Sequence, residues 1–130
     1  MQNLVPYSTL TGSGYGNGPY VQVVEPHLHN LLRKLIPTIH FDEAWYKKRY
    51  SDIAEAVETG QLQSAHEHYV AVGYFENRFP RFVVADSKWY LETYPDVADA
   101  VQRGKFVDAQ EHFEKDGFRE GRLPFYGWNL

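Results

Sequence analysis

The sequence predicts an all-α protein, made of two tandem three-helix repeats that follow an extended N-terminal arm and one amphipathic helix. Three observations lead to this prediction: an internal duplication, helix caps at matching places in both copies, and an N-terminal stretch rich in glycine and tyrosine. Along the chain we expect a flexible docking arm over 1–20, a short strand and amphipathic helix over 21–40, the first repeat over 41–84, and the second repeat with an aromatic tail over 85–130.

The duplication becomes visible when the chain is shifted by 44 residues, the separation of Trp45 and Trp89. The segment 41–82 then aligns without gaps on 85–126, with 16 identical pairs over 42 positions, which indicates two structural copies of one unit. The identical pairs are Asp42/Asp86, Trp45/Trp89, Tyr46/Tyr90, Tyr50/Tyr94, Asp52/Asp96, Ala54/Ala98, Ala56/Ala100, Val57/Val101, Gly60/Gly104, Ala65/Ala109, Glu67/Glu111, His68/His112, Gly73/Gly117, Glu76/Glu120, Arg78/Arg122 and Pro80/Pro124.

Each copy is expected to begin with two short helices. In the first copy, the Asp42 side chain is placed to cap the helix EAWYKKRY, whose aromatic residues recur at helical spacing. The second helix starts at Ser51 or Asp52 and ends at Gly60, with Asp52 and Glu55 spaced as a capping box. In the second copy a proline occupies the position of Ser51, as suits a first helical turn.

The third helix of each copy opens with a further capping box. The pattern is Ser64-x-x-Glu67 in the first copy and Asp108-x-x-Glu111 in the second, and a glycine ends the helix in both. Two different cap residues serve the same position while the glutamate stays. The common requirement is therefore helix initiation, which a cap residue favours by about 0.5–2 kcal/mol.

The recurring aromatic and histidine residues are expected to form the core of each repeat. Trp45 and Trp89 lie on the apolar stripe of the first helix, so we expect both indoles to be mostly buried in matching surroundings. For the recurring histidines, a ring that packs on the tryptophan and donates to a carbonyl oxygen explains the recurrence without chemistry. The predicted structural core residues are Trp45, Tyr50, His68, Trp89, Tyr94 and His112.

The N-terminal arm contains TGSGYGNGPY, which has too little apolar surface to offset its own ordering entropy. We therefore expect a partner to order it, with three tyrosines as anchors. Residues 20–24 can form a short strand of the kind that pairs with another chain. The predicted anchors are Tyr7, Tyr15 and Tyr20.

An amphipathic helix is predicted from Pro26 to Pro37, with Leu28 and Leu32 on its apolar face. Two roles stay open for this face: covering the open end of the first repeat, or binding a partner. Two roles also stay open for Trp128 in the aromatic tail: part of a contact surface, or packing back on the last helix. Leu28, Leu32 and Trp128 complete the predicted partner-binding residues.

Composition argues against several classes of function. The net charge is −4 and the basic residues are scattered among acids, so we expect no nucleic-acid partner. The absence of cysteine removes disulfides and thiolate chemistry. No apolar stretch approaches the length of a membrane span, and the first residues lack the features of a signal peptide. We expect synthesis in the cytoplasm and no membrane insertion.

Metal binding and catalysis are not expected either. His27 and His29 are two residues apart, as are His66 and His68, which places each pair on nearly opposite faces of a helix rather than at the four-residue spacing of a zinc site. The recurring acids are explained by helix capping or by pairing with Arg78. A catalytic site is normally one asymmetric cluster, whereas these residues occur twice. We expect no catalytic, cofactor-binding or metal-binding residues.

Each copy contains W-Y-x-x-x-Y-[SP]-D-[IV]-A-x-A-V, then H-[YF]-x-x-x-G and E-x-R-x-P. This unit, over 41–126, resembles a short helical repeat of bacterial proteins that occurs beside glycosyltransferase domains and in surface-associated proteins. The departures are Ser51 in place of proline and Asn77 in place of glycine. The resemblance implies a fold more than an activity. In size and layout the whole chain also resembles the head-spike base proteins of gene transfer agents, the tailed-phage-like particles of alphaproteobacteria.

The second resemblance implies a non-enzymatic structural adaptor. It would dock on a phage-like capsid and carry a spike fibre that contacts cell-surface polysaccharide, within a particle released from the cell. The alternative is a carbohydrate-binding or accessory module that works beside glycan enzymes. Whether the chain forms a homo-oligomer or contacts polysaccharide directly stays open at this point.

Overall fold

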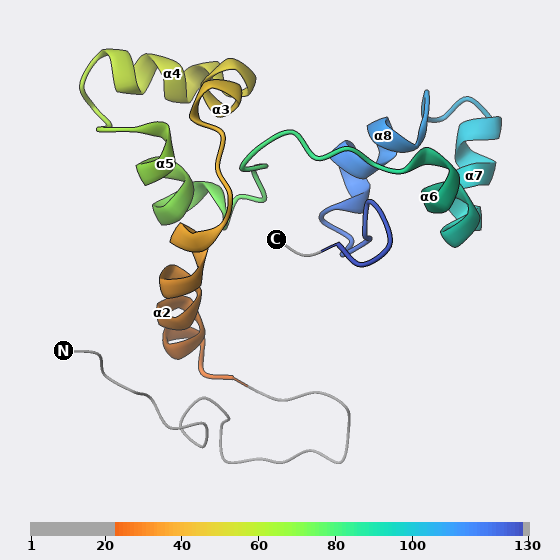
Figure 1. Cartoon of the computed structure of the whole chain (residues 1–130), viewed down its shortest axis with the longest axis horizontal. Coiled ribbons are helices and arrows are strands. Elements are labelled where there is room, and N and C mark those ends of the chain that lie inside the picture. The colour runs from red at the N-terminus through yellow and green to blue at the C-terminus, as the bar shows by residue number, and fades with distance from the viewer. Residues whose placement is uncertain (1–22, 129–130) are drawn as a thin grey trace. The chain divides into compact units, whose positions relative to one another are not determined.

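Figure 1 shows the computed structural model of the chain, which describes residues 23–128. These residues form seven α-helices and no strand or sheet, which confirms the predicted all-α fold class. The arm over 1–20, with its three predicted anchors, and most of the predicted strand over 20–24 lie outside the described residues. The chain divides into two compact units, one ending at Ile39 and the other beginning at His40.

The described part of the first unit contains α2 (Glu25–Leu35) and the 3₁₀ turn η1 (Ile36–Thr38). Pro26 lies in the first turn of α2, where a helix has no partner for the backbone amide that proline lacks. The apolar face of α2 is largely exposed. The exposed fractions of its leucines are 38% for Leu28, 43% for Leu31 and 53% for Leu35.

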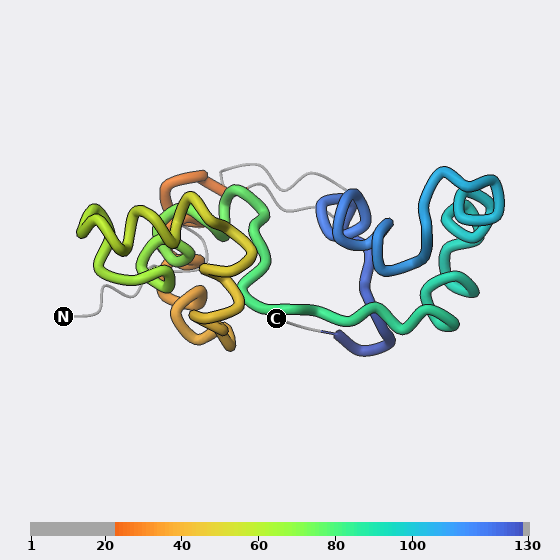
Figure 2. The backbone as a smooth tube through the Cα atoms, turned by 90° about the horizontal axis from the view of Figure 1, so that it is seen from above, coloured from red at the N-terminus to blue at the C-terminus, as the bar shows by residue number. Residues whose placement is uncertain are grey.

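The second unit contains both repeats, and Figure 2 follows the chain from one repeat through a connecting segment, 81–86, into the next. In each repeat the third helix is one α-helical turn that continues as a π-helical turn. The elements of repeat 1 are α3 (Glu43–Arg49), α4 (Ser51–Glu58), α5 (Ala65–His68) and η2 (Tyr69–Gly73). Those of repeat 2 are α6 (Ser87–Thr93), α7 (Pro95–Gln102), α8 (Ala109–His112) and η3 (Phe113–Gly117).

Four of the predicted helix caps are confirmed. Asp42 and Asp86 each accept a hydrogen bond from the backbone amide three residues on, at 2.9 and 3.0 Å. Ser64 and Asp108 do the same for α5 and α8. The returning bond of the capping box differs from the expected one, because Glu67 accepts from the amide of Gln63, one residue before the cap.

The predicted capping box of Asp52 and Glu55 is wrong. The cap position of α4 is Tyr50, which makes no side-chain cap bond. The Asp52 carboxylate instead accepts two hydrogen bonds from the guanidinium of Arg78, at 3.0 and 3.2 Å, and Asp96 accepts the same pair from Arg122. These bidentate pairs tie the second helix of each repeat to the chain that follows the third helix.

The core of each repeat centres on a tyrosine of its first helix. Tyr46 and Tyr90 are both 0% exposed, and each packs edge-on against a buried ring of its own third helix. The two repeats also share core. Phe79, which leaves repeat 1, packs on the rings of Phe113 and Phe118 in repeat 2, with centroids 5.7 and 4.7 Å apart. One hydrophobic core therefore continues across the repeat boundary.

The indoles lie at the margin of this core. Trp45 and Trp89 pack against it but are only partly buried, and each stands edge-on to the tyrosine that follows its helix, with ring centroids 6.3 and 6.1 Å apart. Their surroundings match between the copies. The fully buried position belongs to the next residue along the helix, the tyrosine, because a step of one residue turns the helix by about 100°.

Candidate functional site

The recurring histidines lie beside the central tyrosines. His68 Nδ1 is 3.1 Å from the Tyr46 hydroxyl, and His112 Nδ1 is 2.8 Å from the Tyr90 hydroxyl. This corrects the expectation that each imidazole packs on a tryptophan and bonds a carbonyl oxygen. Both histidines are nevertheless held by the interior of their own repeat, and His112 is only 5% exposed.

The glycine that ends each π-helical turn faces the same hydroxyl. A methyl group at Gly73 would lie against the Tyr46 hydroxyl, and one at Gly117 against the Tyr90 hydroxyl, closer than real atoms approach. From the sequence, these glycines were predicted only to end the third helix of each repeat. In the structure they leave space for the tyrosine–histidine pair.

Electrostatics keeps both partners of this pair neutral. Burial raises the pKa of Tyr90 to about 12 and raises that of Tyr46 further. Burial, with a smaller contribution from a nearby arginine in each case, lowers the pKa of His68 and of His112. A protonated phenol and a neutral imidazole therefore share each hydrogen bond near neutral pH. The same arrangement occurs in both copies, as expected for a structural pair.

These pKa shifts predict a pH-dependent stability. A histidine with a lowered pKa binds its proton more readily in the unfolded chain, where the pKa is about 6.5. We therefore expect the free energy of unfolding to fall as the pH drops from about 7 to about 5, above the titration of ordinary carboxylates. Urea titrations at several pH values measure it. His68→Gln/His112→Gln should flatten the profile, and a wild-type profile that rises on acidification would contradict the assignment.

Tyr50 and Tyr94, also predicted as core residues, fasten the chain that leaves each repeat. The Tyr50 hydroxyl accepts from the amide of Phe79, and the Tyr94 hydroxyl from the amide of Leu123, both at 2.9 Å. The arginine of each bidentate pair lies over the same tyrosine ring, 4.9 Å from its centroid. Such guanidinium–ring contacts add a modest stabilisation.

The buried polar side chains of the repeats are satisfied within the fold. Over residues 23–128, every buried side-chain nitrogen or oxygen atom has a hydrogen-bond partner. In the same part of the chain, no group of three or more histidine and carboxylate side chains is placed to hold a metal ion.

An exposed apolar cluster lies where the chain enters and leaves repeat 2. We call it the aromatic surface. Its members are Phe82, Val84, Phe125 and Tyr126, with exposed fractions of 51%, 59%, 38% and 85%. Exposed aromatic residues of this density are typical of protein-binding surfaces.

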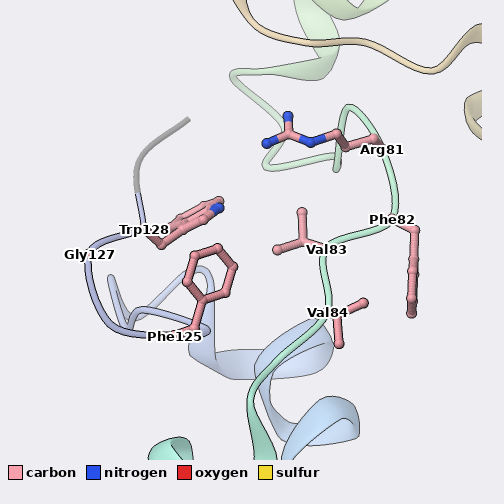
Figure 3. Close-up of a pocket in the computed structure, with 7 residues that line it drawn as sticks. All are labelled: Arg81, Phe82, Val83, Val84, Phe125, Gly127 and Trp128. Atoms are coloured by element: carbon pink, nitrogen blue, oxygen red, sulfur yellow. The ribbon is translucent and has the colours of Figure 1, made fainter.

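Two hollows connect these residues. A pocket of about 270 Å³ lies between the connecting segment and the C-terminal turn. Figure 3 shows Val83, Phe125 and Trp128 directed into it and Phe82 directed away. A second, more open groove of about 620 Å³ shares Val84 and Phe125 and includes Trp89 in its lining. The aromatic surface is therefore contoured rather than flat.

In the connecting segment, exposed and buried side chains alternate along the chain, and the exposed ones form part of the aromatic surface. Phe82 and Val84 are exposed, whereas Val83 and Ala85 are only 6% and 8% exposed. Gln110 holds this arrangement, since its side-chain amide donates to the Val83 carbonyl oxygen at 2.9 Å and accepts from the Ala85 amide at 2.7 Å. A single side chain thus binds the segment as a neighbouring strand would.

Repeat 1 uses the equivalent positions differently. His66 stands where repeat 2 has Gln110, and its ring packs on Phe41 with centroids 4.9 Å apart. Glu43 stands where repeat 2 has Ser87, and its carboxylate accepts from the amides of Ala65 and His66 at the start of α5. At these two positions, which lie close together in the fold, the copies therefore make different contacts.

The C-terminal turn carries the other half of the aromatic surface. The Asp86 amide donates to the Pro124 carbonyl oxygen at 2.9 Å, which joins the two ends of repeat 2. Beyond it, Trp128 packs on the rings of Phe113 and Phe118, both at centroid distances of 6.2 Å. Phe125 and Tyr126 lie between these two attachments and remain exposed.

The predicted partner-binding residues are thus divided. Leu28 is exposed on α2, and Leu32 is half-buried. Trp128 packs back on its own repeat and also lines the pocket of Figure 3, so its role in partner binding stays a prediction. The aromatic surface was not predicted. The shift of 44 residues pairs Phe82 with Tyr126, so two exposed aromatic residues at one repeat position were the signal in the sequence.

No helix within 23–128 combines the length and the apolar character needed to cross a bilayer. Comparison of the chain with protein-family models, with curated proteins and with solved structures gives no match.

Proposed function

We propose that this chain is a non-enzymatic structural adaptor that joins protein subunits in a larger assembly. The observation that carries this proposal is the presence of two exposed apolar surfaces on two separate units. One is the leucine face of α2 and the other is the aromatic surface of repeat 2. An adaptor needs two binding surfaces, and each of these is rich in the residue types that protein interfaces bury.

The polar residues of the repeats favour a scaffold over an enzyme. The tyrosine–histidine pairs and the arginine–aspartate pairs occur once in each copy, in equivalent positions. Their partners lie within the same repeat. These residues have clear structural roles, which is the basis for proposing a protein without catalytic residues.

The resemblance to head-spike base proteins suggests which assembly is involved. We propose a phage-like gene transfer particle, in which the chain docks on the capsid and carries a spike fibre that contacts polysaccharide. The arm over 1–20 and the leucine face of α2 are assigned to the capsid side. Tyr7, Tyr15 and Tyr20 stay predictions as anchors of the arm.

The test uses the α2 leucines in the full chain. Leu28→Glu/Leu31→Glu places two charges on a face that a partner would bury, so we expect the protein to leave the fast-sedimenting fraction of a native extract while both repeats stay folded. Sedimentation with immunoblotting measures the distribution, and circular dichroism checks folding. Val107→Glu is the matched control, because Val107 is 81% exposed outside both surfaces.

The outcomes of this test are distinct. Loss of the double variant from the fast-sedimenting fraction, with retention of the control, supports the adaptor. A wild-type protein that sediments only at the mass of a small homo-oligomer overturns it. Equal loss of the variant and the control would also overturn it, because any added charge would then suffice.

A further inference from the structure

The connecting segment has one edge bound and one edge open. Gln110 occupies the backbone groups of Val83 and Ala85. Successive residues of an extended chain present their backbone groups to opposite edges, so those of Phe82 and Val84 face the other way. Within the described part of the chain, no hydrogen bond is made by the backbone groups of these two residues. An open edge with exposed apolar side chains is a site for strand addition.

We propose that this edge pairs antiparallel with the same segment of a second copy of the chain, across a twofold axis at Val83. The proposal rests on the proposed function and deepens it, because it names the occupant of one of the two adaptor surfaces. The aromatic surface then serves self-association, and the α2 face serves the other partner.

The twofold geometry matches the open groups. With Val83 on the axis, Phe82 lies opposite Val84 of the second copy, and the two residues exchange both backbone hydrogen bonds. Symmetry repeats this exchange, so all four open backbone groups are satisfied. The opposed side chains form an aromatic–β-branched pair on the exposed face, a favourable cross-strand combination. A twofold interface requires such self-complementarity.

Charge selects the antiparallel direction. The segment begins with Arg81 and ends with Asp86. With Val83 on the axis, an antiparallel second copy places its Ala85 opposite Arg81, whereas an in-register parallel copy would place Arg81 beside Arg81 and Asp86 beside Asp86. Like charges at such short distances oppose association, which disfavours the parallel arrangement.

The flanking residues supply the apolar area that a short pairing needs. Two paired strands alone are marginal in water. Phe125 and Tyr126 adjoin the segment in the open groove, and Tyr126 is 85% exposed. A second copy seated on the edge would cover them. Burial of aromatic side chains would then stabilise the pair together with the backbone bonds.

Self-association of the purified full chain tests the proposal. We expect a dimer by sedimentation equilibrium, and Phe82→Ser/Val84→Ser should raise the dissociation constant by about tenfold or more, since two exposed apolar contacts are lost in each copy. The melting profile of the diluted monomer should stay unchanged. Val107→Ser is the matched control and should dimerise as the wild type does. A monomeric wild-type protein overturns the proposal.

Cross-linking then tests the direction and the register. The chain has no cysteine, so single cysteines report one position each. A mixture of Phe82→Cys and Val84→Cys chains, with different tags, should give a mixed cross-linked dimer with a short thiol reagent. Dominant links between identical positions would indicate parallel pairing and overturn the model of the edge. The model would also be overturned if the double variant Phe82→Cys/Val84→Cys gave cross-links only within one chain and none between two chains.

The two proposals fail separately. Suppose that the wild-type protein is a monomer by sedimentation equilibrium, and that Leu28→Glu/Leu31→Glu still causes loss from the fast-sedimenting fraction. The self-association proposal is then overturned, and the adaptor proposal stands. If the protein dimerises but never joins a larger particle, the pairing of the two edges stands and the adaptor proposal is overturned. Glycan-array binding by a monomer that Phe82→Ser/Val84→Ser abolishes would assign the aromatic surface to sugar and overturn the self-association.

Discussion

Tyr90→Ala is expected to lower the free energy of unfolding by about 3–5 kcal/mol, the range found when a buried aromatic ring is removed from a core. Tyr90 is 0% exposed, and its hydroxyl is the hydrogen-bond partner of His112. The change therefore leaves a cavity and also a buried imidazole without its partner. Urea denaturation followed by circular dichroism measures the loss.

Two further variants separate these contributions. Tyr90→Phe keeps the ring and removes only the hydrogen bond, for which we expect a loss of about 1–3 kcal/mol from the unpaired histidine. Val107→Ala, at an 81% exposed position, should stay within about 0.5 kcal/mol of the wild type. If Tyr90→Ala were as mild as Val107→Ala, Tyr90 would not be the centre of the core.

Gly117→Ala is expected to lower the free energy of unfolding by about 1–3 kcal/mol, as overpacking of a filled core does. The added methyl carbon would clash with the Tyr90 hydroxyl oxygen, and neither residue can move away easily because both belong to packed helices. Thermal or urea unfolding measures the effect. Gly73→Ala should behave in the same way, because the Tyr46 hydroxyl lies against that position.

The partner of the clash can be removed to test this explanation. In a Tyr90→Phe background the hydroxyl is absent, and the nearest remaining atoms are a His112 nitrogen at 3.3 Å and a Tyr90 ring carbon at 3.4 Å. The cost of Gly117→Ala should then shrink by about 1 kcal/mol in a double-mutant cycle. Equal costs in both backgrounds would place the strain elsewhere, in the π-helical turn itself.

Four helix N-caps were predicted correctly because each depends on few neighbouring residues. The caps at Asp42, Asp86, Ser64 and Asp108 need only a side-chain oxygen three residues before an amide. Asn77 follows the same logic. It adopts a left-handed conformation with φ of 59° where repeat 2 has a glycine, and asparagine is among the few other residues that do so readily.

Features that depend on the whole fold were harder to predict. Trp45 and Tyr46 are adjacent, and helical spacing alone does not tell which of the two faces the interior. For the Asp52 carboxylate the sequence left two alternatives, capping its own helix or pairing with Arg78, and only the folded chain shows that Arg78, 26 residues away, binds it. The aromatic surface depends on a clamp from Gln110 to the connecting segment, and no local pattern in the sequence predicts that contact.

The difference between Gln110 and His66 sets a rule for building longer arrays from this unit. Gln110, which binds the connecting segment, belongs to the repeat that follows this segment. A copy of repeat 2 added after the second repeat would therefore bind its connecting segment in the same way, whereas a copy of repeat 1, with histidine at this position, would not. An engineered third unit should therefore keep glutamine at this position. The duplicated halves have become an opening module and an extending module, and their order in the chain cannot be exchanged freely.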